Sequence, residues 1–275
     1  MIRKRLAVFS GLLITLSMVT AAPALAASPP PANDLMTNAQ TISVPFGPQT
    51  IDTTGATTDS DDATLNSFCG APKTDASIWY TITPATDMGI LVDLTGSDYS
   101  AGAIVAEGTA PNWNVLACAP FGVVWSATAG TTYTILVFDD QQDGVGNGGN
   151  LQISVTEAPP PPELSLTVNP RGTFDPKTGG ATVHGTVTCT GDVVFSFIDV
   201  SMRQKTGRLF IDGEGAIEGF TCDGTEQKWS VDIFPFNGVF KGGRTATFSF
   251  ALACDNFQCG DGFSETVVSL SSKKK

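Results

Sequence analysis

The sequence contains only one histidine, His184, and no Gly-x-Ser-x-Gly motif. A histidine-rich metal site is therefore impossible, and a Ser-His-Asp or Cys-His catalytic group would have to use this residue. His184 lies between Val183 and Gly185 in an alternating segment typical of a strand, where a structural or surface role is the better interpretation. We therefore expect no hydrolase of the serine or cysteine kind.

Positive charge is nearly absent from the first half of the chain. Between residues 27 and 157, Lys73 is the only base against fourteen acidic residues, a net charge of −13. From residue 158 onward, eleven bases face thirteen acids, a net charge of −2. Because so acidic a first half repels phosphate groups, nucleic acid and anionic lipid are excluded as its partners. Solubility outside the cell and cation binding are the two interpretations of this charge.

Long hydrophobic runs are also missing, apart from one at the start. Residues 3–5 are basic, residues 6–19 are mostly apolar, and small residues precede a predicted cleavage point after Ala26. This order predicts a secretory signal peptide over residues 1–26, because the apolar run is shorter than the roughly twenty residues that span a bilayer. No later segment is long and apolar enough for a membrane span. We expect a secreted, extracellular protein.

The cysteines support the same compartment, because an even number in an exported chain is typical of disulfides. Two lie in the first half and are expected to pair, while the four in the second half allow three pairings. The short spacing of Cys254 and Cys259 suits a bridge across a hairpin. That bridge would leave Cys189 to pair with Cys222. A four-cysteine zinc site is the less favoured alternative. The six are Cys69, Cys118, Cys189, Cys222, Cys254 and Cys259.

Proline-rich segments divide the chain. Residues 27–31 form a spacer after the signal peptide, and residues 158–162 form a linker, because consecutive prolines favour an extended conformation. The predicted domains are therefore residues 32–157 and 163–272, followed by a basic tail over 273–275. A solvated tail is the better interpretation of these three lysines.

Both halves contain short alternating segments separated by Gly, Asp, Asn and Thr, with no convincing helical periodicity over three turns. This pattern predicts an all-β protein of two antiparallel sandwiches, the second immunoglobulin-like. The expected strands in the first half are 77–82, 89–94, 101–106, 115–118, 122–128, 132–138 and 151–155. Those in the second half are 164–168, 181–189, 193–202, 208–213, 228–234, 245–254 and 265–270.

One acidic loop has the spacing of a calcium site. Asp139, Gln141 and Asp143 place oxygens at alternate positions before a glycine, as hard cations require. Asn150 stands where a bidentate acid is expected, so a solvated acidic turn is the favoured alternative. A second group of oxygens comprises Asp59, Asp61 and Asp62. Calcium is the only cofactor to which the sequence points.

Trp113 is the candidate ligand-binding residue. It lies in a polar segment, residues 111–114, where an exposed ring flanked by amides could stack on a sugar. The alternative is a ring that folds back over the edge of the sandwich.

Pairs of acids could also serve glycoside hydrolysis. Glu214 with Glu218, or Asp139 with Asp143, would have to lie roughly 5–9 Å apart. Acids are so common in this chain that we expect no enzyme.

Several motifs of the first half resemble the bacterial pre-peptidase C-terminal (PPC) domain. They are residues 31–34, 38–40, 53–57, 77–80, 95–98, 129–133 and 144–149. The resemblance implies a jelly-roll-like sandwich and a non-catalytic accessory domain of exported proteins, some of which bind calcium or insoluble polymers. The chain departs from the family at residues 100–101 and 107–108.

The second half resembles an uncharacterised domain of secreted bacterial proteins. The residues that carry this likeness are 185–189, 222–225, 229, 241–243 and 254–259. It implies a disulfide-stapled sandwich and no activity.

These observations predict a secreted, non-enzymatic protein with an adhesive or ligand-binding role, whose partner is an extracellular polysaccharide or protein polymer. One alternative is a calcium- or polymer-binding accessory module that acts with a separate secreted enzyme. The other is a hydrolase that uses two carboxylates.

Overall fold

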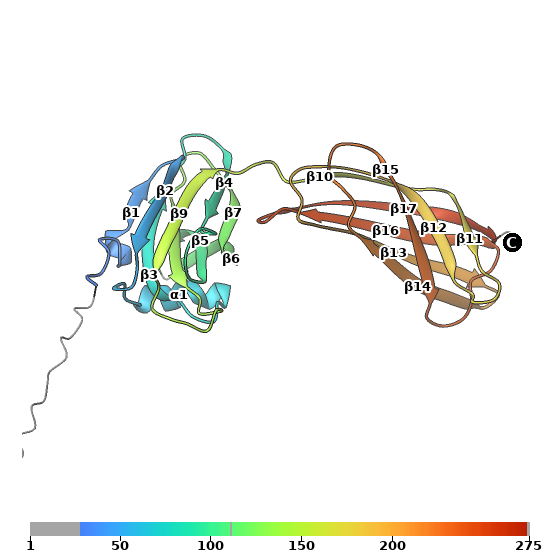
Figure 1. The fold of residues 1–275 in the computed structure, drawn as a ribbon, viewed down its shortest axis with the longest axis horizontal. Helices are drawn as coiled ribbons and strands as arrows, with labels where there is room; N and C mark the ends of the chain where they lie inside the picture. The colour runs from blue at the N-terminus through green and yellow to red at the C-terminus, as the bar shows by residue number, and fades with distance from the viewer. Residues whose placement is uncertain (1–27, 111, 274–275) are drawn as a thin grey trace, which may run out of the picture.

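The computed structural model describes residues 28–110 and 112–273, and these residues form an almost entirely β structure. The predicted signal peptide, its cleavage point and the last two lysines lie outside the described residues. Strands β1–β9 and strands β10–β17 form separate sheets, and the proline-rich segment 158–162 connects them (Figure 1). No helix in the described part of the chain is long and apolar enough to cross a membrane.

The N-terminal half, residues 32–157, contains two sheets. One has the strand order β1-β3-β8-β5-β6 and the other has the order β2-β9-β4-β7. All neighbouring strands are antiparallel except β1 and β3. The strands are β1 (Gln40–Ile42), β2 (Phe46–Asp52), β3 (Asp75–Ile82), β4 (Met88–Asp93), β5 (Ala101–Thr109), β6 (Asn112–Pro120), β7 (Gly122–Ala127), β8 (Tyr133–Asp139) and β9 (Asn150–Glu157).

These two sheets enclose the main core of the N-terminal half. Ile78, Tyr80 and Ile135 of the five-stranded sheet pack with Ile90 and Trp125 of the four-stranded sheet. This arrangement is a sandwich, because each sheet buries one face against the other. The all-β, antiparallel class predicted from the alternating segments is confirmed.

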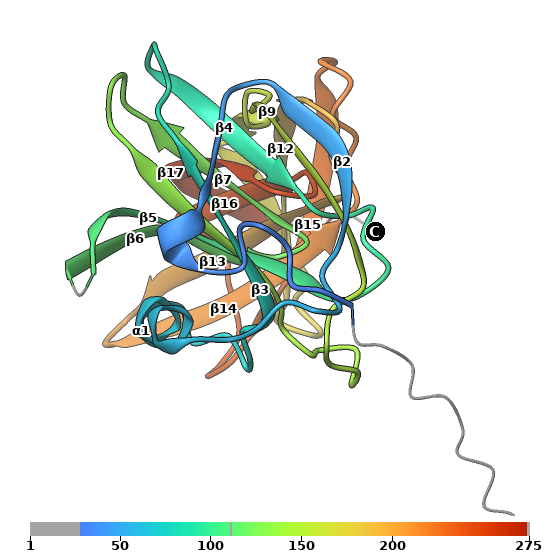
Figure 2. The ribbon, with the colours of Figure 1, turned by 90° about the vertical axis from the view of Figure 1, so that its left-hand side faces the viewer.

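The other face of the five-stranded sheet is also covered. The short helix η1 (Met36–Asn38) and the helix α1 (Ser60–Cys69) lie on this side of the N-terminal half (Figure 2). Leu65 of α1 packs in one cluster with Trp79 and Leu136 of the sheet. A strand that is covered on both faces needs apolar residues at consecutive positions, which explains why every residue of β8 is buried.

Sequence analysis missed α1 because it buries only Asp62 and Leu65, which leaves no apolar periodicity to detect. Its start is set by a capping box in which the Asp59 carboxylate accepts from the amide of Asp62 and the Asp62 carboxylate accepts from the amide of Asp59. Its end is set by Gly70, whose left-handed backbone favours glycine.

The C-terminal half, residues 163–272, forms one sheet that closes on itself. The strand order is β10-β12-β11-β17-β16-β13-β14-β15, and β15 pairs again with β12. Each of seven strands therefore has a neighbour on both sides, and together they form a closed ring in the order β12-β11-β17-β16-β13-β14-β15. The strands are β10 (Glu163–Val168), β11 (Arg171–Phe174), β12 (Ala181–Thr190), β13 (Phe195–Thr206), β14 (Leu209–Glu218), β15 (Gln227–Pro235), β16 (Gly243–Cys254) and β17 (Cys259–Ser272).

The interior of this ring is filled by side chains such as Val183, Val200 and Trp229. The sequence predicted an immunoglobulin-like sandwich for this half, a fold with two separate sheets. The strands here pair as one closed sheet, so the immunoglobulin-like class stays a prediction.

Three disulfides staple the fold, and the predicted pairing is confirmed. Cys69 of α1 is bonded to Cys118 of β6, which ties the helix to the sheet beneath it. In the C-terminal half, Cys189 is bonded to Cys222, and Cys254 to Cys259 across the hairpin between β16 and β17.

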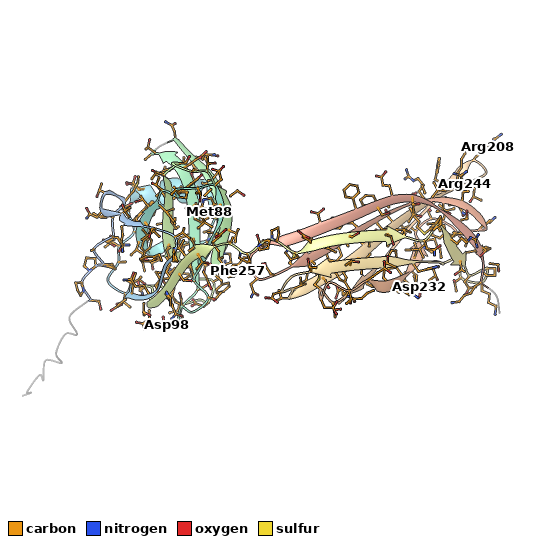
Figure 3. All side chains as sticks on the ribbon, turned by 90° about the horizontal axis from the view of Figure 1, so that it is seen from above. Met88, Asp98, Arg208, Asp232, Arg244 and Phe257 are labelled. Carbon is orange, nitrogen blue, oxygen red and sulfur yellow. A yellow bond between two sulfur atoms is a disulfide. The ribbon has the colours of Figure 1, made fainter. Side chains whose placement is uncertain are left out.

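The tip of that hairpin touches the N-terminal half. A β-carbon at Gly122 would lie 2.9 Å from the ring of Phe257, so the ring packs against the backbone at the start of β7. The side-chain amide of Gln258 donates to the carbonyl of Pro159, 2.6 Å away. Figure 3 shows Phe257 at this junction and Arg208 and Arg244 at the opposite end of the C-terminal half.

Candidate binding surface

The predicted calcium loop lies beside the start of β3. Asp139 ends β8 directly opposite Asp75, and the loop continues to Asn150. The side-chain amide of Gln141 reaches Asp75 at 3.1 Å, and the backbone amide of Asn147 reaches the same carboxylate oxygen at 3.1 Å. The three predicted ligands therefore lie in one compact loop.

Backbone amides already occupy the carboxylates of this loop. Asp139 is buried and accepts from the amides of Gln141 and Gly148, at 2.8 and 3.0 Å. Asp143 accepts from the amides of Val145 and Ser100, at 2.9 and 3.2 Å. These bonds hold the loop in place without a cation.

Burial raises the pKa of Asp139, and the negative charges of Asp143 and Asp75 raise it further against the two amide bonds. Among residues 28–110 and 112–273, no group of three or more His, Cys, Asp or Glu side chains is placed to hold a metal ion. The loop thus has the hydrogen bonds expected of an acidic turn, the interpretation that the sequence favours, and calcium binding stays the untested alternative.

Trp113 does not present its ring to solvent. It lies in β6, is only 6% exposed, and packs with Trp79, Leu65 and Val115 beneath α1. The expectation of an exposed, sugar-stacking ring is therefore wrong, and the alternative of a folded-back ring is right. The physical reason is the second core on the outer face of the five-stranded sheet, which the sequence pattern did not reveal.

The remaining candidates are separated by the fold. His184 is exposed on β12, opposite Ser230 of β15. Glu214 and Glu218 lie four residues apart on β14, which places their α-carbons about 13 Å apart along the strand. The roughly 5–9 Å of a glycosidase pair is measured between carboxyl groups, and a backbone spacing this long does not favour such a pair.

A different surface stands out on the C-terminal half. Five phenylalanines are among the outward side chains of β13, β16 and β17, while alternate residues such as Ile198 and Ala251 point into the ring. We call this surface the Phe face, and its apolar members are Phe195, Phe197, Phe248, Phe250, Leu252 and Phe263.

Strand register makes the Phe face continuous. Phe250 lies directly opposite Phe263, and Phe197 lies directly opposite Leu252. The ring centroids of Phe195 and Phe197 are 5.7 Å apart, and those of Phe197 and Phe250 are 6.0 Å apart. Phe263 is 69% exposed, so the face is open to solvent.

Next to the rings, a shallow depression of about 480 Å³ lies between Phe248, Glu265 and Val267. Contiguous apolar patches on a soluble protein mark sites of interaction.

Acidic side chains are interleaved with these rings. Asp199 is directly opposite Phe250, Glu265 is opposite Phe248, and Asp261 is opposite Leu252. Burial raises the pKa of Asp199, and the charge of Glu214 on the neighbouring strand raises it further. The face therefore combines apolar area with negative charge.

Sequence analysis did not find this surface. The alternation over residues 245–250 predicts a strand, but its polar members are the buried ones: Thr245, Thr247 and Ser249 point inward while Phe248 is exposed. The ring interior is already filled by larger side chains from the facing strands, so only small residues of β16 fit there. The available signal was the repetition of phenylalanine at alternate positions in β13 and β16.

The chain has little similarity to known proteins. No protein-family model matches it, and no curated protein does. A solved structure of the ApaA protein from Bordetella pertussis is 16% identical, with a TM-score of 0.26, and the match covers 40% of this chain and 95% of that one.

Glycosidase structures match a longer stretch of the chain. The β-glucuronidase of Parabacteroides merdae is 12% identical with a TM-score of 0.26, and the match covers 70% of this chain and 27% of that one. A GH2 β-galacturonidase from Eisenbergiella tayi is 13% identical with a TM-score of 0.23, covering 70% and 35%. This chain thus corresponds to a minor part of each glycosidase, and the scores are too low to carry an argument.

Proposed function

We propose that this protein is exported, is not an enzyme, and binds an extracellular polymer through the Phe face. The observation that carries the proposal is the continuous group of exposed and half-buried phenylalanine rings on β13, β16 and β17. Rings that are held on a rigid sheet lose little conformational freedom when they bind, so their apolar area contributes to affinity almost undiminished.

The disulfides support the extracellular compartment in this proposal. Three disulfides and no free cysteine among the described residues fit an oxidising environment. The predicted signal peptide agrees with export.

The two halves would have different tasks. In the N-terminal half most apolar side chains are enclosed between two sheets and beneath α1, exposed ones such as Phe68 and Phe121 are scattered, and the acidic loop is tied by its own hydrogen bonds. In the C-terminal half the same kind of side chain is left on the outside. We assign binding to the C-terminal half and a supporting role to the N-terminal half, in keeping with the accessory role that the PPC resemblance implies.

A retention assay tests the proposal. Purified protein is incubated with chitin, cellulose, bacterial cell wall and collagen, and the bound fraction is measured after washing. We expect retention on at least one polymer and its loss in a Phe248→Ser, Phe263→Ser double variant. Phe68→Ser is the matched control, because Phe68 is a 58% exposed phenylalanine on α1, remote from the Phe face. Retention by none of the polymers, or equal retention of all variants, refutes the proposal.

A further inference from the structure

The carboxylates around the Phe face differ from those of the acidic loop over residues 139–149. Among the described residues, five of them make no hydrogen bond and no ion pair, whereas Asp139 and Asp143 of the acidic loop each accept two backbone amides. The five are Asp199, Glu214, Glu218, Asp261 and Glu265. Carboxylates that hold no structure and flank an apolar surface are available to a ligand.

One base, Arg203, lines the same depression as Phe248 and Glu265, but its ion-pair partner is a different acid. The ion pair of the described residues joins Arg203 to Asp212, at 2.6 Å, toward the end of the face that carries Arg244. Asp261 lies toward the other end, near the hairpin that touches the N-terminal half. Around Phe197, Phe250 and Phe263 the face thus carries acids alone, and a cation placed there would relieve the repulsion between Asp199 and Glu214.

The shape of the face restricts the class of partner. A peptide strand needs a free sheet edge, but β13, β16 and β17 each have two neighbours. An amphipathic helix needs a groove, and the Phe face is the outer surface of a sheet with only a shallow depression. Neighbouring rings of the face are tilted by 47° and 59° to each other, so they do not form one flat platform. A positively charged polymer whose successive sugar units can each turn to contact one ring satisfies these restrictions.

We propose that the partner of the Phe face is a polysaccharide of amino sugars, an inference that rests on the proposed function. The apolar faces of its pyranose rings stack on Phe197, Phe250 and Phe263, and its ammonium groups pair with Asp199, Asp261 and Glu265. Stacking supplies the contact area, and charge selects the amino sugar over its N-acetylated form.

Two forms of one polymer test this inference. The protein is bound to chitosan and to fully N-acetylated chitin of the same chain length, at low and at high salt. We expect about tenfold tighter binding to chitosan at low salt, as two or three exposed ion pairs provide, and loss of the difference at high salt. Equal affinity for both forms overturns the amino-sugar inference.

Variants separate this inference from the proposed function. Asp261→Asn with Glu265→Gln should remove the preference for chitosan but keep binding to chitin. The control pair Glu163→Gln with Glu226→Gln makes the same change in net charge at exposed positions off the face and should keep the preference. Phe263→Ser should weaken binding to both polymers, and circular dichroism verifies its fold.

Two results would overturn the inference in different ways. If binding to both polymers depends on Phe263 but not on the acids, the amino-sugar inference fails and the proposed function stands. If polylysine beads retain the protein as well as chitosan does, and Phe263→Ser does not weaken that retention, the face selects charge alone and the inference fails.

Discussion

The capping residue Asp62 should make the stability of the N-terminal half depend on pH, because its carboxylate is buried. Its side chain is fully buried; one carboxylate oxygen accepts from the Asp59 amide and from the Ser77 hydroxyl, and the other has no partner. Burial raises the pKa of Asp62 to about 6, from 3.8 in the unfolded chain, with smaller contributions from the charges of Asp59 and Asp61. The folded state therefore binds a proton that the unfolded state releases.

The sign of the effect follows from this difference. Because the folded protein holds the proton more tightly, Asp62 favours folding at pH values below about 4, and this contribution is lost as pH rises to about 6. A shift of about two units corresponds to about 3 kcal/mol in the free energy of unfolding. Asp62→Asn keeps a neutral oxygen for the same two donors and cannot titrate.

The assay is urea denaturation between pH 4 and 8, followed by tryptophan fluorescence, since Trp79, Trp113 and Trp125 all lie in the N-terminal half. The stability of the natural protein relative to Asp62→Asn should fall by about 3 kcal/mol from pH 4 to 7. Asp61→Asn, which removes a charge but no cap, should retain the slope and move its midpoint to lower pH. Parallel pH profiles for the natural protein and Asp62→Asn would refute the reasoning.

Three further predictions concern stability and calcium. Trp113→Ala should cost about 3–5 kcal/mol in urea denaturation, but Phe263→Ala less than about 1 kcal/mol, and equal costs would contradict their placement. Replacing Cys69 and Cys118, which are 49 residues apart, by serine should lower the free energy of unfolding by about 4 kcal/mol. Replacing Cys254 and Cys259, which are 5 residues apart, should lower it by about 2 kcal/mol. The reverse order would show that loop length does not govern the effect of these disulfides. Calorimetry should detect no calcium binding, because the carboxylates of loop 139–149 are occupied, and micromolar binding would restore the calcium site.

Strand positions were predictable where burial has a period of two or where apolar residues run together between turns. The segment 77–82 lies within β3, and 132–138 coincides with β8 to within a residue. The helix α1 was not predictable from periodicity, because its role is to carry Leu65 onto the sheet and to present Cys69 to β6. A helix with one buried apolar residue leaves no repeating pattern in the sequence.

For the candidate sites, the sequence and the structure differ more than they do for the strands. Sequence reasoning selected Asp139 and Asp143 because acids cluster there, yet the folded loop turns their oxygens toward backbone amides. It considered Trp113 as an exposed ligand-binding ring because its neighbours are polar, with a folded-back ring as the alternative, and only the structure reveals the second core that buries it. Hydrogen-bond partners and burial both depend on contacts between distant residues, which spacing cannot reveal.

By itself the sequence indicated the all-β class, because alternation is local, and it favoured one pairing of the cysteines from their spacing, which the structure confirms. The tertiary structure alone decided which face of each strand points outward. In β16 it buries Thr247 and exposes Phe248, since the ring interior has room only for small side chains there. That reversal places the phenylalanines of β13, β16 and β17 together in solvent, beside carboxylates that no other residue of the described chain satisfies.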